Sequence, residues 1–547
     1  MAVAVPVVRN DPHKACAVFN RADDVPIDVV YRFRVGLDDH PVGMDAQEAA
    51  DLLHDSFAQE LLLKGNFPRT GTEVLAALTA LGEREDQLGQ HKFFLVGEGS
   101  QIPVAPATGR VIRALRYLVT CGRDGQPNGE GPGPDILVST FNPDEPGIEL
   151  MAWDHQIGGF NFYRTFGKTD TAWVFTGNSR NALAPATRAR GPFESHRSGS
   201  ILMKELRAPW IHWHSVDAPV ADDVYPPDHP LRTHPWFLAA IGDRLGAFTC
   251  ETQAVRPSID RWLRAHADAL LAADEPAASE PILASLVDTP TVNITCSHQH
   301  GDGSLDAGGP VELPPSFFVD IDAFGSEHGG LGLLTAPLTL TVSRAIYDHA
   351  LTTFDVHLSD GAGFTRPGDT FFAFAVPERA YEDHRMVVEA RRIGLLSDRF
   401  AATILMVDFP NPIFSDRRAS LLRHFPEQID LSQRKQFSDR VASTIVAAAT
   451  HGSAEAEFAE LWSAGDTWRE VFSKRLTDYL GAVAQAVQAE AGFRDIYRVA
   501  VSRRKQMVDT MPIAEFGLLF PVSDVEPTPV VLHADATAHS VTPSLNA

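Results

Sequence analysis

Two histidines separated by a single residue form the densest group of potential metal ligands in this chain. The segment reads Trp210-Ile211-His212-Trp213-His214. Alternate side chains of a strand share a face, so His212 and His214 would lie on one side, roughly 6–7 Å apart. At that separation both imidazoles can reach one metal ion. The spacing therefore predicts a metal site, with Trp210 on the same face as a substrate-binding residue.

A second pair of suitable ligands lies shortly upstream. Glu194 and His196 are also two residues apart, so an extended backbone would again place both on one face. Two adjacent antiparallel strands would then gather three imidazoles and one carboxylate around one point. This ligand set suits iron, copper, manganese or zinc. The alternative is that the histidines are structural and hydrogen-bond to the backbone or to water.

A further histidine pair follows Cys296 in the segment Cys296-Ser297-His298-Gln299-His300. His298 and His300 are good ligand types at a spacing of two residues. The next residues, Gly301-Asp302-Gly303, predict a loop at this point. We expect His298 and His300 to form a separate metal site or to complete the first one.

An Asp-x-Asp pair ends an apolar run that we expect to be a strand over 317–321. Asp320 and Asp322 form this pair. Two carboxylates at a strand end can hold a divalent cation on a diphosphate, as in nucleotide-sugar transferases. This pair gives an alternative function, a cation-dependent transferase.

Composition limits the partners and the compartment. The chain has 547 residues, 47 Lys and Arg against 71 Asp and Glu, and a net charge of −24. An acidic surface repels phosphate backbones and anionic lipid, so nucleic acid and membrane are not expected partners. The longest basic cluster, Arg503-Arg504-Lys505, is expected at the solvated end of a helix. The four cysteines form no CxxC pair, and we find no signal peptide and no membrane-length apolar run, which favours a cytoplasmic location.

The periodicity of apolar residues predicts an α+β chain with a β-rich antiparallel central region and a helical C-terminal third. Short apolar runs over 136–176, separated by turn residues, predict an antiparallel meander. Helices are expected over 44–65, 73–83, 257–274 and 467–491, the last with capping-box spacing at Thr467 and Glu470 and an end at Gly492. The expected regions are an N-terminal α+β region (1–135), a β-rich region with the His-Trp-His segment (136–256), a helix and linker (257–281), a mixed α+β region (282–376), a helical region (377–524) and a disordered tail (525–547).

The expected function is a metal-dependent enzyme, an oxidoreductase acting on a small organic substrate. Tryptophans at 153, 173, 210 and 213 are expected to supply an apolar, water-excluding wall, which suits redox chemistry at a metal. A non-enzymatic binding or scaffold protein with structural histidines is the second alternative. A His-Trp-His run also occurs in multicopper oxidases, but the downstream His-Cys-His run is missing, so no family is assigned.

Overall fold

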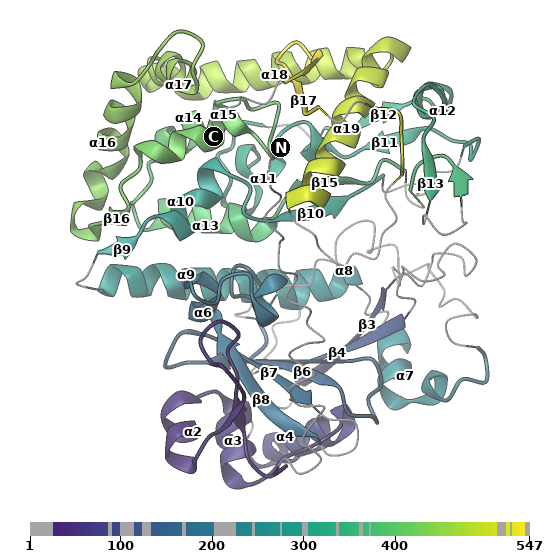
Figure 1. Ribbon diagram of the computed structural model, residues 1–547, viewed down its shortest axis with the longest axis vertical. Coiled ribbons are helices and arrows are strands. Elements are labelled where there is room, and N and C mark those ends of the chain that lie inside the picture. The colour runs from purple at the N-terminus through teal and green to yellow at the C-terminus, as the bar shows by residue number, and fades with distance from the viewer. Residues whose placement is uncertain are drawn as a thin grey trace, which may run out of the picture. The chain divides into compact units, whose positions relative to one another are not determined.

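The chain divides into two units, and the division falls inside one helix, α9 (Arg256–Ala272). The computed structural model describes residues 26–85, 90–98, 114–122, 133–166, 171–201, 226–242, 247–273, 276–297, 305–334, 338–359, 365–370, 373–510, 521–525 and 528–541. Unit 1 contains the described residues up to Ala265, and unit 2 contains those from His266 onward. Both are drawn in Figure 1.

Unit 1 is built on an eight-stranded sheet with the order β2-β1-β8-β7-β6-β5-β4-β3. All neighbouring strands are antiparallel except β1 and β8, which are parallel. The predicted antiparallel meander is therefore confirmed. The strands are β1 (Tyr31–Arg32), β2 (Val42–Gly43), β3 (Gln90–Glu98), β4 (Ala114–Gly122), β5 (Ile136–Thr140), β6 (Ile148–Asp154), β7 (Gly159–Phe166) and β8 (Ala172–Asn178).

One face of this sheet packs against helices from the first part of the chain (Figure 1). They are α2 (Ala46–Leu52), α3 (Ser56–Glu60) and α4 (Gly71–Glu85). The single helix expected over 44–65 is wrong, because Asp45 and Asp55 each accept a backbone N–H and begin separate helices. Phe57 of α3 anchors the packing through edge-to-face contacts with Tyr163 and Trp173, at 5.4 and 4.9 Å between ring centroids.

The remaining helices of unit 1 follow β8. They are α6 (Ser179–Leu183), α7 (Pro235–Gly242), α8 (Ala247–Cys250) and the first part of α9. The expected helix over 257–274 is thus confirmed as α9. Its Trp262 is buried against the start of β7, where a Cβ on Gly159 would lie 3.0 Å from the indole ring. Glycine at this position therefore lets the helix approach the sheet.

Unit 2 is mainly helical, as predicted for the C-terminal third. Its helices after α9 are α10 (Glu280–Val287), α11 (Ile321–Phe324), α12 (Arg344–Thr353), α13 (Tyr381–Arg392), α14 (Asp398–Met406), α15 (Asp416–Ala419), α16 (Arg434–Ala447), α17 (Ala454–Trp462), α18 (Trp468–Ala486) and α19 (Glu490–Thr510). Short strands pair in twos, namely β10 (Val292–Thr295) with β15 (Val376–Arg379), β11 (Val311–Leu313) with β12 (Leu340–Val342), β13 (His357–Ser359) with β14 (Thr365–Pro367), β9 (Ala277–Ala278) with β16 (Gln428–Ile429) and β17 (Val530–Leu532) with β18 (Ala538–Ser540).

The aromatic and aliphatic stripe predicted over 467–491 is buried on α18. The predicted helix end is wrong, because α18 stops at Ala486 and Gly492 lies inside α19. Thr467 occupies the N-cap position, but its side chain makes no capping hydrogen bond. The spacing of the apolar residues therefore predicted the buried face of α18 correctly but did not predict the turn between α18 and α19.

Two expectations for the C-terminal region are wrong. Part of the tail predicted to be disordered forms the β17–β18 hairpin, in which Val530 and Leu532 are buried. The basic cluster is also not at a solvated helix end, because Arg503 and Arg504 are 1% and 3% exposed. None of the helices in the described part of the chain is long and apolar enough to cross a membrane.

Candidate functional site

The described part of the predicted metal site is a loop that follows α6 in unit 1. It begins with the 3-10 helix η2 (Gly191–Glu194), which has Pro192 in its first turn. Proline suits this position because its fixed φ matches a helix start and no N–H is needed. Ser195 continues with helical backbone angles. The expected extended backbone around Glu194 and His196 is therefore wrong, and the two residues do not share a strand face.

The imidazole of His196 is held in a defined orientation. Its ring packs on Phe162 of β7, with the ring centroids 5.2 Å apart. Its Nδ1 atom lies 3.0 Å from the carbonyl oxygen of Ser200. A carbonyl only accepts, so Nδ1 carries the proton and the lone pair of the neutral ring is on Nε2. Metal-binding histidines are commonly oriented in this way, with the second ring nitrogen donating to a carbonyl.

The turn that supplies this carbonyl is itself held by side chains of the helices α6 and α9. Ser179 Oγ donates to the carbonyl oxygen of Gly199 at 2.5 Å, and Trp262 Nε1 donates to that of Ser198 at 2.7 Å. Gly199 has a φ of +79°, and a Cβ there would lie 2.5 Å from the carbonyl oxygen of Ser179. Glycine is required at this position, and two hydrogen bonds hold the turn.

Glu194 lies at the surface of the same loop, directly after the buried Phe193. Partial burial raises the pKa of its carboxyl, against the lowering effect of the positive charge of Arg197. A carboxylate that has lost part of its hydration gains from a nearby cation. Here that cation is Arg197.

The other predicted ligands lie outside the described residues. These are His212 and His214, with Trp210 beside them, and the second pair His298 and His300. Within the residues that the structure describes, no group of three or more His, Cys, Asp or Glu side chains is placed to hold a metal ion.

The predicted aromatic wall is not continuous in its described part. Trp173 packs on Phe57 on the helix-covered face of the sheet, and its Nε1 donates to the carbonyl oxygen of Pro68 at 2.8 Å. Trp153 lies opposite Phe160 on the neighbouring strand, and the guanidinium of Arg261 lies 4.0 Å above its ring. Trp153 and Trp173 belong to opposite faces of the sheet, so both serve the core rather than one pocket.

The Asp-x-Asp pair lies in unit 2, and the strand expected before it is wrong. Proline at 314 and 315 removes ladder donors and favours a helix start, and the chain forms the 3-10 helix η7 (Pro315–Phe317). Asp320 then caps α11, with Oδ1 accepting from the backbone N–H of Ala323 at 3.0 Å and Oδ2 from Arg379. Asp322 follows in the first turn of that helix. Both oxygens of Asp320 are engaged, which does not favour a cation there.

Sequence reasoning missed His384, which lies close to this pair. His384 is 3% exposed on α13, and its Nε2 donates to the carbonyl oxygen of His328 at 3.1 Å. Burial lowers the pKa of His384, against the raising effect of Asp322 and Asp320. For Asp320, burial acts to raise the pKa, but the charges of Arg379 and His384 and two hydrogen bonds lower it. Asp320 and His384 thus interact with each other and with neighbouring groups of the fold, which indicates a structural role.

A buried acid cluster in unit 1 was also missed. The side chain of Asp55 accepts from Tyr163 Oη at 2.5 Å and from Asn161 Nδ2 at 2.8 Å. Asn161 Nδ2 also donates to Asp154 at 3.0 Å, so one amide bridges two fully buried carboxyls. Burial raises the pKa of Asp55 to about 6, against the lowering effect of its hydrogen bonds. Asn161 and Tyr163, two polar side chains in a strand with several buried aromatic residues, were the signal that could have revealed the cluster.

Comparison with known proteins gives no match for this chain, whether among protein families, curated proteins or solved structures. The site must therefore be judged on its own residues.

Proposed function

We propose that the protein is a metal-dependent enzyme whose metal centre includes Glu194 and His196, on the loop that follows α6. The supporting observation is the orientation of His196, whose Nδ1 donates to the carbonyl oxygen of Ser200 and whose lone pair is therefore on Nε2. His212 and His214 are the further ligands of this proposal, and Glu194 supplies the carboxylate.

The ligand types suit iron, copper, manganese or zinc. A bound metal of this kind would supply Lewis acidity or one-electron chemistry toward a small organic substrate, which makes an oxidoreductase the leading reaction class. The residues of this chain contribute the orientation of the ligands, because the turn at 196–200 is anchored by Ser179 and Trp262. We place the protein in the cytoplasm, with a small molecule rather than nucleic acid as its partner.

The first prediction concerns metal content. Wild-type protein reconstituted with iron, copper, manganese or zinc should retain about one ion per chain. His196→Ala should lower the affinity at least roughly tenfold, because one ligand is removed. Elemental analysis after dialysis against a weak chelator measures this. His40→Ala is the matched control, since His40 is an exposed histidine of the same unit.

Two outcomes contradict the proposal. One is a folded wild-type protein that stays metal-free with all four metals. The other is a His196→Ala variant whose metal content equals that of His40→Ala. In the first case the histidines are structural and the binding or scaffold alternative becomes the better one. In the second case His196 is not a ligand, and the site proposed on this loop is wrong.

The second prediction isolates the carboxylate. Glu194→Gln keeps the size and surface position of the side chain but removes its charge, so we expect weaker metal retention with an unchanged thermal midpoint. Chelator competition against the wild-type protein gives the change in affinity. Equal affinities of the two proteins would place Glu194 outside the ligand set while leaving His196 in it.

A transferase that uses the Asp-x-Asp pair is less favoured. Asp320 is buried, paired with Arg379 and engaged as a helix cap, so a cation would have to displace both interactions.

A further inference from the structure

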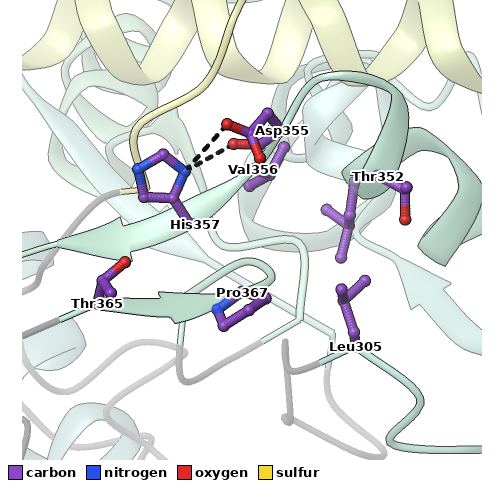
Figure 2. A pocket seen from close by; sticks show the side chains of 8 residues that line it. Leu305, Thr352, Asp355, Val356, His357, Thr365 and Pro367 are labelled. Atoms are coloured by element: carbon purple, nitrogen blue, oxygen red, sulfur yellow. Dashed lines mark hydrogen bonds and ion pairs between the residues drawn. The ribbon is translucent and has the colours of Figure 1, made fainter.

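Unit 2 contains an open pocket of about 350 Å³ between the end of α12 and the β13–β14 hairpin. Its apolar lining comes from Leu305, Leu351, Val356 and Pro367. In Figure 2, Leu305 and Thr352 border one side of the hollow, and Pro367 and Thr365 of β14 border another. This volume is at the lower end of the range for small-molecule sites.

The turn that ends α12 builds one wall of this pocket. The backbone N–H of Val356 donates to the carbonyl oxygen of Leu351 at 2.9 Å, and that of Asp355 donates to Thr352 at 3.2 Å. These two hydrogen bonds form a Schellman motif, a common way for a helix to end. In this motif an apolar contact joins the two positions that Leu351 and Val356 occupy here. The apolar part of the wall is therefore preformed by a helix end.

Asp355 occupies the left-handed position of this motif, with a φ of +46°. Glycine is the residue that adopts this conformation without steric cost. An aspartate here gives up backbone stability and places a carboxylate at the pocket. The side chain is 77% exposed, so solvent and ligands can reach it.

His357 stands beside this carboxylate at the start of β13, as Figure 2 shows. Its Nδ1 donates to the backbone carbonyl oxygen of Asp355 at 2.7 Å and lies 3.9 Å from the carboxylate oxygen Oδ2. In the neutral ring the lone pair is then on Nε2, and Figure 2 shows this atom on the side of the ring away from Asp355.

Hydrogen bonds near its base hold the β13–β14 hairpin, which carries His357, against α12. The backbone N–H of Gly368 donates to the carbonyl oxygen of Val356 at 2.8 Å. The next residue, Asp369, is fully buried and accepts from Tyr347 Oη of α12 at 2.8 Å. The carboxylate of Asp369 thus links the end of β14 to α12.

We propose that this pocket binds a small organic ammonium ion, a primary amine attached to a compact apolar group. The carboxylate of Asp355 attracts the positive charge, and the apolar residues contact the hydrocarbon part. Neither Lys nor Arg is among the residues that line the pocket in the described part of the chain, so the lining itself does not neutralise the carboxylate. This site shares no residue with the metal centre proposed above.

The test compares three probes of one shape, namely 2-phenylethylamine, 2-phenylethanol and phenylacetate, by ligand-detected NMR and calorimetry on the full-length protein. We expect the amine to bind about fivefold more tightly than the alcohol, the effect of one exposed ion pair. Phenylacetate should bind most weakly. The preference for the amine should fall with added salt.

Asp355→Gly is the decisive variant, because glycine relieves the left-handed backbone and should keep or raise the thermal midpoint. It should abolish the preference for the amine. Ala189→Gly, at another exposed residue with positive φ (+54°) in unit 1, is the matched control and should keep that preference. The proposal is wrong if no probe binds, if the alcohol or phenylacetate binds as well as the amine, or if Asp355→Gly binds like the wild type.

Discussion

Replacing Asp369 by alanine should destabilise unit 2 by about 3–5 kcal/mol, the effect of leaving a buried cation without its partner. The Oδ2 atom of Asp369 accepts from Tyr347, Tyr497 and Arg504 at 2.8, 2.9 and 2.9 Å. Asp369 and Arg504 are 0% and 4% exposed at their side chains. Burial and the charge of Asp369 raise the pKa values of both tyrosines well above their usual range, so the hydroxyls stay protonated and donate.

The measurement is urea unfolding combined with a hydrogen-exchange pulse, read on peptides of α12 and α19. Asp478→Ala is the control, because Asp478 pairs with Lys474 on α18 at 63% side-chain exposure and should contribute less than about 1 kcal/mol. Asp369→Ala combined with Arg504→Met should recover part of the loss, since the second change removes the unpaired charge. A single variant as stable as Asp478→Ala would contradict the argument.

The stability of unit 1 should fall as the pH rises from about 4 to about 6, because of Asp55. Its folded-state pKa is about 6, against 3.8 for an ordinary aspartate. Between these values the unfolded chain has released the proton and the folded chain still holds it, so the folded state loses its advantage as the pH rises. The full difference amounts to about 3 kcal/mol, present below the lower pKa and lost above the higher one.

Asp55→Asn should remove this pH dependence, since an amide does not titrate and its oxygen can still cap α3. Pulsed hydrogen exchange in urea, read on peptides of α3 and β7 at several pH values, measures the slope. Asp45→Asn is the matched control, because Asp45 makes the same capping contact at the exposed start of α2. If wild type and Asp55→Asn lose stability in parallel across this range, the buried carboxyl is not the source.

The class of fold and most regular elements could be predicted because their signals are local. Side chains repeat every two residues in a strand and about every 3.6 in a helix, which identified the β5–β8 meander, α9 and the buried face of α18. These patterns depend on backbone geometry and on which side must be apolar. The strand predicted over 317–321 is wrong for a reason that is also local, because Pro315 begins a 3-10 helix there.

The candidate metal site, too, could be predicted only in part from the sequence. Residue types and spacing selected Glu194 and His196, but the strand geometry expected for them was wrong, because the 3-10 helix at Gly191–Glu194 replaces the extended backbone. The ring orientation of His196 depends on Ser200 and on a turn fixed by Ser179 and Trp262. The identities of these partners follow from packing onto β7 and α9.

Only the tertiary structure decided which charged side chains are buried. Asp369 meets Tyr497 and Arg504, which are 128 and 135 residues away, and Asp55 meets Tyr163 across 108 residues. A run of charged residues such as 503–505 is predicted to be exposed to solvent. The reason is that burying a charge costs free energy unless partners are present. Those partners come from distant elements brought together by the core, so no local pattern of the sequence can reveal them.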